Sequence, residues 1–393
     1  MLFRSGITNP NTLTPWTLDT ETFLIAPGRK LPRGVCFTYA EAPWDYAGIQ
    51  PLWDRDLVEE IILPRLKDPQ TLIVGQNIAY DLGVLADTYP HLLPWIFKAY
   101  VQGRVSCTKI RERLILLARG EMTDGARFSM DALWKKYTGE DISQQKEKLS
   151  PHTPPKAWRL RFGELYKCPL HKWPLEALQY AKEDATRTGI IWEHQTHADA
   201  PCVRLNGRMV NEEEQAAADF CLLLMGAWGF RTDAQRIAAV AEQAATTIER
   251  AKHVLVEAGL YRREGTELVK DTKAIRNLVT VAYDGDPPLT DKEAVCTDKD
   301  TLQEAPAERQ PTVSIGGEDI PILQALASIS TAEHNLNQYL PVLEQGVNRP
   351  ITPDANVLLA TGRASTSKPA VQVFPRSGGW RECIVPQIGR AHV

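Results

Sequence analysis

The chain has 393 residues, which is too long for one ordinary hydrophobic core, so two or three domains are expected. Apolar residues make up 43% and charged residues 24%, the balance of a soluble globular protein. The net charge of −4 is by itself no signature of nucleic-acid binding, and no apolar run reaches the ~18 residues of a membrane-spanning helix.

The cysteines and the N-terminus indicate the cellular compartment. Seven cysteines are scattered along the chain, and an odd, scattered set favours free thiols over a disulfide framework. The first residues contain no apolar stretch of signal-peptide length. We therefore expect a cytoplasmic protein, located in the host cytoplasm if the source is viral.

The first part of the chain alternates predicted strands with predicted helices. Apolar and β-branched runs bounded by Pro and Gly predict strands at 14–23, 34–40 and 71–77. Apolar spacing predicts helices at about 80–87, 129–137 and 174–197. This alternation predicts an α/β domain that ends near residue 200.

After this point the pattern becomes mainly helical. Long helices are expected at about 212–228 and 233–259, and Thr232 or Asp233 would cap the second of them. A loop-rich stretch at 283–318 precedes a further helix at about 322–344. An irregular, basic segment completes the chain.

Basic residues form two stripes on this acidic protein. Five cations between Arg104 and Arg119 face one acid, Glu112, and four cations lie between Val357 and Arg381 with no acid. Such stripes suit binding to a phosphate backbone. A solvated face is the alternative interpretation.

Two carboxylates lie two residues apart in the first predicted strand. Side chains repeat every two residues along a strand, so Asp19 and Glu21 would project from the same face. Acids on a buried face are costly unless a positive charge neutralises them, and Mg²⁺ and Mn²⁺ prefer oxygen ligands. A divalent-metal site is one interpretation, and a solvent-exposed strand end is the other.

Two further groups of polar residues follow. Asn77 lies where the third strand ends and Asp81 in the helix after it, at the edge where α/β folds gather functional side chains. A helix cap together with the helix dipole would also explain this pair. Tyr180 and Asp184 are four residues apart and would share one helix face, although this spacing is common by chance.

In this order, the three groups resemble the exonuclease motifs of the DEDD superfamily, in the tyrosine-bearing subclass found in proofreading domains of family A DNA polymerases. The resemblance covers residues from about 12 to 198 and includes the segment FSMDALWKKYTG. It implies an RNase H-like fold, a mixed sheet flanked by helices. From about 138 to 172 the match fades, and we expect a local insertion there.

The resemblance also implies a chemistry. Two divalent metal ions, Mg²⁺ or Mn²⁺, would activate water and stabilise the departing 3′-oxygen of a DNA strand. Asp19 would bridge the two ions, Glu21 and Asp184 would hold the ion that activates water, and Asp81 would hold the other through water. The hydroxyl of Tyr180 would orient the attacking water.

The end of the chain resembles a second part of the same polymerases. The segment ATGRASTSKPAVQVFPR, followed by GGWRECIVP, is similar to the block that grips the primer–template backbone. The resemblance implies DNA contacts from Arg363, Ser365, Lys368, Gln372 and Arg381, and from Asn77 in the exonuclease site. The expected partners are a single-stranded DNA 3′ end in that site and primer–template DNA at the block. A basic surface loop is the alternative.

The polymerase motifs that follow this block in the family are not found in the sequence, so polymerase activity is not expected. The final peptide IGRAHV is what a sequencing adapter encodes, which predicts a non-native tail at 387–393. The expected organisation is an exonuclease domain at 1–200, a partial polymerase domain (thumb and start of the palm) at 201–386, and this tail. The source is expected to be phage-like.

The predicted function is therefore metal-dependent 3′-5′ exonuclease proofreading during DNA replication. One alternative is a catalytically idle module that only binds nucleic acid, which the intact carboxylates argue against. A second is an RNA-trimming exonuclease, and the TGRASTSKP segment favours DNA over RNA.

Overall fold

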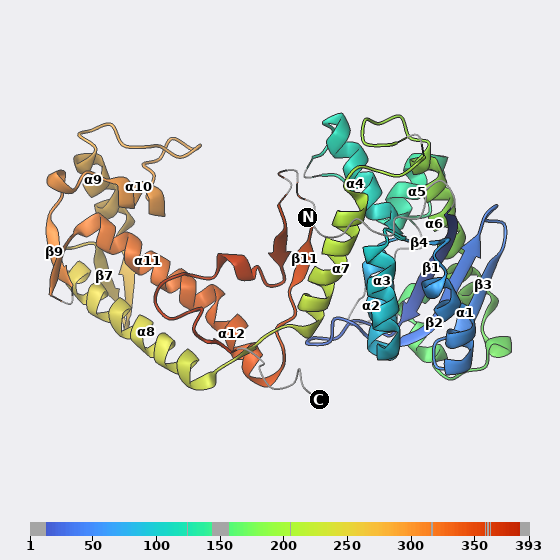
Figure 1. Cartoon of the computed structure of the whole chain (residues 1–393). Helices are drawn as coiled ribbons and strands as arrows, with labels where there is room; N and C mark the ends of the chain where they lie inside the picture. The colour runs from blue at the N-terminus through green and yellow to red at the C-terminus, as the bar shows by residue number, and fades with distance from the viewer. Residues whose placement is uncertain are drawn as a thin grey trace. The chain divides into compact units, whose positions relative to one another are not determined.

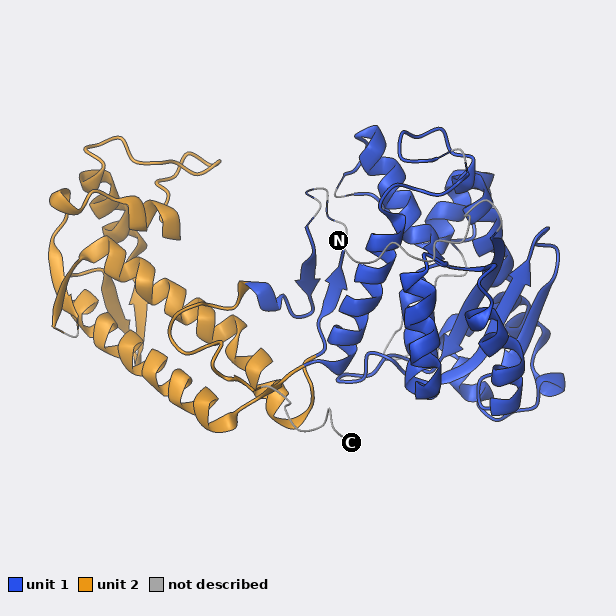
Figure 2. Cartoon of the chain, viewed as in Figure 1, with its two compact units in different colours: residues 1–229, 352–372 blue, residues 230–351, 373–393 orange. Residues whose placement is uncertain are grey.

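The chain forms two compact units, which are described separately (Figure 2). The computed structural model describes residues 13–385 except 124, 144–156, 205, 316, 358, 360 and 362. Unit 1 consists of residues 1–229 and 352–372, and unit 2 of residues 230–351 and 373–393. Residues 201–229 thus group with unit 1, beyond the predicted boundary at 200. In the described part of the chain, no helix has the length and apolar character needed to cross a membrane.

Unit 1 is built on a mixed sheet whose described strands have the order β3-β2-β1-β4-β5 (Figure 1). The strands are β1 (Thr14–Thr22), β2 (Gly34–Glu41), β3 (Ala47–Pro51), β4 (Thr71–Gly75) and β5 (Val105–Cys107). β1 pairs antiparallel with β2 and parallel with β4. The three predicted strands are confirmed, whereas β3 and β5 are short and carry too little alternation to be recognised.

Helices flank this sheet. They are α1 (Arg55–Lys67), α2 (Ile78–Thr88), α3 (Leu93–Val101), α4 (Thr108–Arg119), α5 (Met130–Thr138), α6 (Leu175–Thr196) and α7 (Glu212–Trp228). α6 packs against β1, β2 and β3, and α2 contacts β1 and α7. A two-stranded pair, β11 (Asp354–Asn356) with β12 (Ser365–Ser367), also belongs to unit 1, and β11 contacts α7.

The alternation of side chains along β1 positions the functional groups. Trp16 and Leu18 are 1% exposed and pack in a cluster with Ile78 and Leu82 of α2. The odd-numbered residues of β1 point to the other face of the sheet. This alternation turns Asp19 and Glu21 toward α6.

Unit 2 is mainly helical. Its helices are α8 (Ala234–Glu257), α9 (Thr272–Ala282), α10 (Lys299–Glu304), α11 (Ile322–Gln338) and α12 (Leu340–Asn348). Its strands are β6 (Arg231–Thr232), β7 (Tyr261–Glu264), β8 (Glu267–Lys270), β9 (Thr312–Ile315), β10 (Glu318–Pro321) and β13 (Ile384–Val385). Leu255, Val279, Leu323 and Leu326 lie in its own hydrophobic cluster.

Two helix boundaries in unit 2 test the sequence signals. Asp233 caps α8, because its carboxylate accepts hydrogen bonds from the backbone N–H groups of Gln235 and Arg236. The single helix predicted at 322–344 is wrong, since α11 ends at Gln338 and α12 begins at Leu340. Pro341 lies in the first turn of α12, where its missing N–H is tolerated, but it cannot continue a preceding helix.

Three of the five cations in the first basic stripe lie inside the protein, whereas Arg119 is exposed. Arg104 and Arg111 are fully buried, and Arg113 is 9% exposed. The guanidinium of Arg104 donates to the carbonyls of Leu66 and Thr71, at 2.7 and 3.1 Å. The buried part of this charged run thus supplies internal hydrogen-bond donors, whose partners lie far away along the chain.

Candidate active site

Three carboxylates converge at the sheet face that α6 covers. One oxygen from each of Asp19, Glu21 and Asp184 lies within 4.8 Å of the other two. Asp19 and Glu21 come from alternate positions of β1, and Asp184 from the middle of α6, which packs against β1. The strand period and this packing together build the cluster.

Asp81 lies beside the cluster but is not part of the three-oxygen group. Its Oδ1 accepts hydrogen bonds from the backbone N and the hydroxyl of Thr20, at 2.9 and 2.7 Å. Thr20 stands between Asp19 and Glu21 in β1, so these bonds fix the first turn of α2 against the strand. Asp81 is buried, with 3% of its surface exposed.

The four acids destabilise one another's charged forms. Burial raises the pKa of Asp19 well above its ordinary value, and the charges of Asp81, Glu21 and Asp184 raise it further. Burial and the charges of Asp184 and Asp81 likewise raise the pKa of Glu21. Burial raises the pKa of Asp81 to about 7, although hydrogen bonds from Thr20 act against this rise.

Asp184 has one cation beside it. Burial raises its pKa to about 6, while the Arg187 guanidinium at 3.6 Å favours the charged form. Such a concentration of buried carboxylates, with oxygen as the only donor type, fits divalent Mg²⁺ or Mn²⁺. The oxygens of Asp19, Glu21 and Asp184 lie close enough together to share one ion.

Tyr180 lies one helical turn before Asp184. A hydrogen bond from its hydroxyl lowers the pKa of Asp184. Burial, together with the charge of Asp184, raises the pKa of Tyr180 above its ordinary value, so the phenol stays neutral near pH 7. A neutral hydroxyl beside the carboxylates can exchange hydrogen bonds with a water molecule.

The described part of the predicted insertion packs under this tyrosine. Residues 157–172 form three short turns, Trp158–Leu160, Phe162–Leu165 and Leu170–Lys172. Phe162 is fully buried, and its ring centroid lies 6.0 Å from that of Tyr180. Residues 144–156 lie outside the described residues. The segment 157–172 therefore supports the face of α6 that carries Tyr180.

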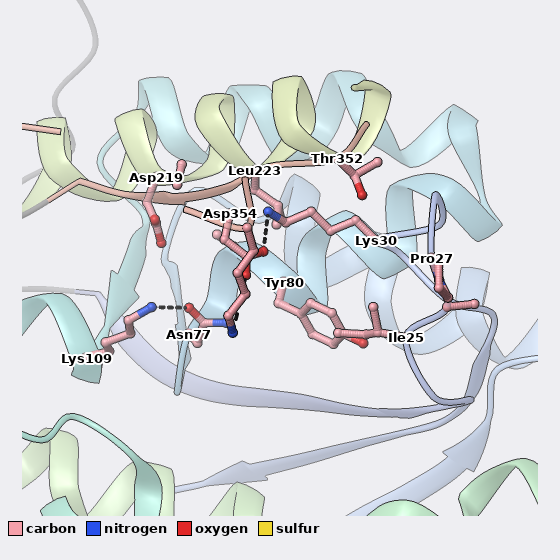
Figure 3. A pocket seen from close by; sticks show the side chains of 14 residues that line it. Ile25, Pro27, Lys30, Asn77, Tyr80, Lys109, Asp219, Leu223, Thr352 and Asp354 are labelled. Carbon is pink, nitrogen blue, oxygen red and sulfur yellow. Dashed lines mark hydrogen bonds and ion pairs between the residues drawn. The ribbon is translucent and has the colours of Figure 1, made fainter. Parts of the chain in front are cut away.

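Asn77 begins α2 in a left-handed conformation, with φ of 66°. Its side chain makes no capping hydrogen bond, contrary to the helix-cap interpretation. Instead, its Oδ1 accepts a hydrogen bond from Nζ of Lys109 at 2.9 Å (Figure 3). This arrangement leaves the amide NH₂ as the group of Asn77 that can donate to a ligand.

Asn77 lines a cavity of about 750 Å³, and Figure 3 shows the side chains of its wall. Tyr80 lies on one side of it, and its hydroxyl is 3.1 Å from that of Thr22, at the end of β1. Lys30 binds Asp354 at 2.9 Å on the other side. The cavity thus connects the beginning of α2 with the hairpin that carries the C-terminal block.

The five predicted DNA-contacting residues of the C-terminal block fall into two units. Arg363, Ser365, Lys368 and Gln372 belong to unit 1, and Arg381 belongs to unit 2. The Lys368 side chain is 84% exposed, and its Nζ lies 4.0 Å from Asp354.

Two of these residues make internal hydrogen bonds. The Gln372 amide binds the backbone of Thr366 and Ala364, at 3.1 and 3.4 Å. The Arg381 guanidinium donates to the carbonyl of Phe374 at 2.9 and 3.1 Å. Residues 358, 360 and 362 lie outside the described residues. The DNA contacts themselves stay a prediction.

Sequence reasoning missed three residues of this site. Thr20 holds Asp81, Arg187 faces Asp184, and Lys109 holds Asn77. Arg187 follows Asp184 by three residues on a helix, a spacing that could have identified it. No local signal identifies Lys109, because it is 32 positions away from Asn77.

Comparisons with known proteins identify an exonuclease domain in this chain. Residues 8–194 match the family model of the 3′-5′ exonuclease of family A DNA polymerases. Over 76 residues the chain is 37% identical to DNA polymerase I of Pseudomonas aeruginosa PAO1, a match that covers 18% of this chain and 8% of that protein. The chain therefore spans a small part of this relative.

A solved structure has a similar fold. A structure described as the POL domain of Pol1 from M. smegmatis in complex with DNA primer-template and dNTP matches with a TM-score of 0.51 and 16% identity. The match covers 95% of this chain and 54% of that one. A structure described as the apo form of a nuclease matches with a TM-score of 0.33 and 19% identity, over 55% of this chain and 84% of that one, which is too weak to support an inference.

The sheet, its helices and the matched family define a 3′-5′ exonuclease domain, the class of nuclease that the sequence motifs predicted. The chain is also similar to DNA polymerase I over 76 residues, and its fold is similar to that of the mycobacterial polymerase domain. The matched residues, 8–194, thus resemble the exonuclease domain of family A DNA polymerases.

Proposed function

We propose that unit 1 hydrolyses DNA from its 3′ end in a reaction that requires divalent metal ions, and that this activity proofreads during replication. The observation that carries the proposal is the convergence of Asp19, Glu21 and Asp184 within 4.8 Å. Burial makes this negative cluster unfavourable without a cation. The two-ion requirement rests on Asp81, which lies beside the cluster.

The carboxylates and Tyr180 would have separate roles in the hydrolysis. Bound Mg²⁺ or Mn²⁺ would supply a water of lowered pKa and neutralise charge on the reacting phosphate. Asp19, Glu21 and Asp184 would hold one ion, and Asp19 with Asp81 the other. The Tyr180 hydroxyl would orient the attacking water, since it is neutral and lies one turn from Asp184.

Substrate contacts come from groups around the carboxylates. The Asn77 amide, held by Lys109, would donate to an oxygen of the strand near its 3′ end. The C-terminal block, with exposed Lys368 and with Arg363, would bind primer–template DNA. The division into an exonuclease domain at 1–200 and a polymerase region after it is part of this proposal.

The proposal is tested with 5′-labelled single-stranded DNA and Mg²⁺ or Mn²⁺, beside an Asp19→Ala/Glu21→Ala variant. A ladder that shortens from the 3′ end, and that EDTA and the double substitution both abolish, is the expected result. Binding of DNA with no degradation in either metal would instead support the idle binding module. A matched RNA oligonucleotide, degraded as fast as the DNA or faster, would support the RNA-trimming alternative.

A further inference from the structure

Unit 1 contains a second cavity, of about 680 Å³, that the proposed chemistry does not use. Gly34, the first residue of β2, and Tyr89, just after α2, both line it. Its other walls carry cations and aromatic rings, chiefly Arg33, Lys167 and Trp53. Lys167 has φ of 61° in the turn that follows Phe162–Leu165. The cavity therefore combines positive charge with flat apolar surface.

Two of its cations have no acidic partner within the described part of the chain. Arg29 lies 3.6 Å from Asp87, the one acid among the described residues that line the cavity. Arg33 and Lys167 have no carboxylate within 4.0 Å among the residues that the structure describes. Both lie over the ring of Tyr166, at 5.2 and 5.7 Å from its centroid. No described carboxylate neutralises these two positive charges, so an anion from outside the chain can bind them.

Aromatic packing fixes the ring that these cations share. Trp53 contacts Tyr166 edge to face, with centroids 5.4 Å apart, and Phe23 contacts it at the same distance. The Tyr166 hydroxyl accepts a hydrogen bond from Arg33 at 3.4 Å. A fixed ring flanked by cations is a surface on which an unpaired base can stack while its phosphate is neutralised.

The cavity adjoins the strand that carries the catalytic acids. The backbone N–H of Phe23 donates to the carbonyl of Arg33 at 3.0 Å. Phe23 follows Glu21 by two residues, directly after β1. A DNA strand whose 3′ end lies at the carboxylates can therefore continue toward Arg33 within the same unit.

We propose that this cavity binds a nucleotide of single-stranded DNA upstream of the 3′ end, an inference that rests on the proposed nuclease function. The phosphate would bind Arg33 and Lys167, and the unpaired base would stack on the ring of Trp53, which also lines the cavity. Duplex DNA does not suit the cavity, because its bases are already stacked on one another. The cavity thereby favours a frayed 3′ end over a paired one.

The test measures DNA binding in the Asp19→Ala/Glu21→Ala background, so that its result does not depend on cleavage. Fluorescence anisotropy with a labelled single strand of about 12 nucleotides is recorded over a range of salt concentrations. Adding Arg33→Ala/Lys167→Ala should weaken binding about tenfold and lower the slope of log affinity against log salt by about 0.7, the contribution of the one phosphate that is no longer neutralised. The charge-preserving pair Arg33→Lys/Lys167→Arg should restore affinity to within about twofold.

The control is Lys67→Ala/Lys98→Ala. These two lysines lie over the Trp95 ring of the same unit, at 4.9 and 5.2 Å, and therefore match the tested pair in charge and setting. An equal loss of affinity in the control would overturn the proposal, because it would reflect net charge alone. Unchanged affinity and salt slope in the Arg33/Lys167 variant would also overturn it.

Two further arms separate the possible ligands and the two proposals. One arm tests whether thymidine monophosphate binds the parent protein but not the Arg33/Lys167 variant. If it does, and strand binding is the same in both proteins, the cavity would be a site for a free nucleotide and the proposed strand site would be contradicted. In the active protein, the Arg33/Lys167 substitutions should raise KM for the long strand. They should leave KM for a dinucleotide substrate unchanged. If the Arg33/Lys167 variant loses strand binding and the active protein cleaves no DNA, the strand-binding proposal for this cavity would stand and the proposed nuclease function would be refuted.

Discussion

At the carboxylate cluster, side chains that repel one another are held together by the packing of α6 on β1. Burial and mutual repulsion raise the pKa of Asp19, and burial raises the pKa of Asp184 to about 6. The fold therefore supplies the energy that keeps these charges close. A site arranged in this way is less stable without a cation than with one.

Replacing one of these acids should stabilise the metal-free protein while it removes activity. A carboxyl group whose pKa is raised on folding contributes stability when protonated, and this contribution is lost as pH rises through the folded pKa. Asp19→Asn should therefore raise the free energy of unfolding in EDTA at pH 8 by about 1–3 kcal/mol, and by less near pH 5.

Urea unfolding at both pH values checks this, with Asp56→Asn as a control because Asp56 is exposed on α1. A destabilised Asp19→Asn protein at pH 8 would contradict the electrostatic argument. The same variant should show no nuclease activity with Mg²⁺ or Mn²⁺.

Lys109 is expected to act on DNA through Asn77. Lys109→Met removes the hydrogen bond that orients the Asn77 amide, so KM for single-stranded DNA should rise about tenfold with kcat within about twofold. In an Asn77→Ala background the lysine change should have little further effect, because the group it orients is gone. Additive effects in this double-mutant cycle would show that Lys109 contacts the DNA directly.

At the scale of elements, a buried ion pair connects α4 with α7. Arg111 and Glu212 are 2.9 Å apart, and both side chains are 0% exposed. Ser106 in β5 and the backbone N of Met209 donate to the same carboxylate. This network ties residues after 200 to the sheet of unit 1, which explains why unit 1 extends past the predicted boundary.

Breaking this pair should be costly and should change the response to acid. Burial alone would raise the pKa of Glu212, but the charges of Arg111 and Arg208 outweigh it and lower the pKa. Glu212 therefore contributes stability that is present above about pH 4.5 and is lost as pH falls through the lowered value.

Glu212→Gln should lower the free energy of unfolding by about 3 kcal/mol at pH 7, and should reduce the loss of stability below about pH 4. Glu213→Gln is the matched control, because the neighbouring Glu213 side chain is 49% exposed and its pair with Arg208 is worth less than about 1 kcal/mol. Urea unfolding measures both variants. Equal losses of unfolding free energy in the two would argue against a dominant contribution from the buried ion pair.

At the scale of the whole molecule, each unit has its own hydrophobic core. Leu82 is fully buried in unit 1, and Leu326 is 1% exposed in unit 2. Separate cores predict two transitions in calorimetry rather than one. Leu326→Ala should lower the free energy of unfolding of unit 2, and Leu82→Ala that of unit 1, each by about 2–5 kcal/mol. A single transition that both variants shift equally would contradict this.

The sequence by itself determined the parts whose cause is local. Alternation along Thr14–Thr22 places Asp19 and Glu21 on one face, and the spacing of four places Tyr180 above Asp184 on one side of a helix. Asp233 was identified as a possible helix cap from its position alone. These features follow from the periods of strand and helix, which a short stretch of sequence fixes.

Only the tertiary structure decided which charges are buried and what they bind. Arg111 could not be told from a solvated residue, because its partner Glu212 lies 101 positions away. The same holds for Lys109 with Asn77, and for Phe162 beneath Tyr180. Burying a charge or a ring is favourable only when a complementary group meets it, and distant segments meet only after the chain has folded.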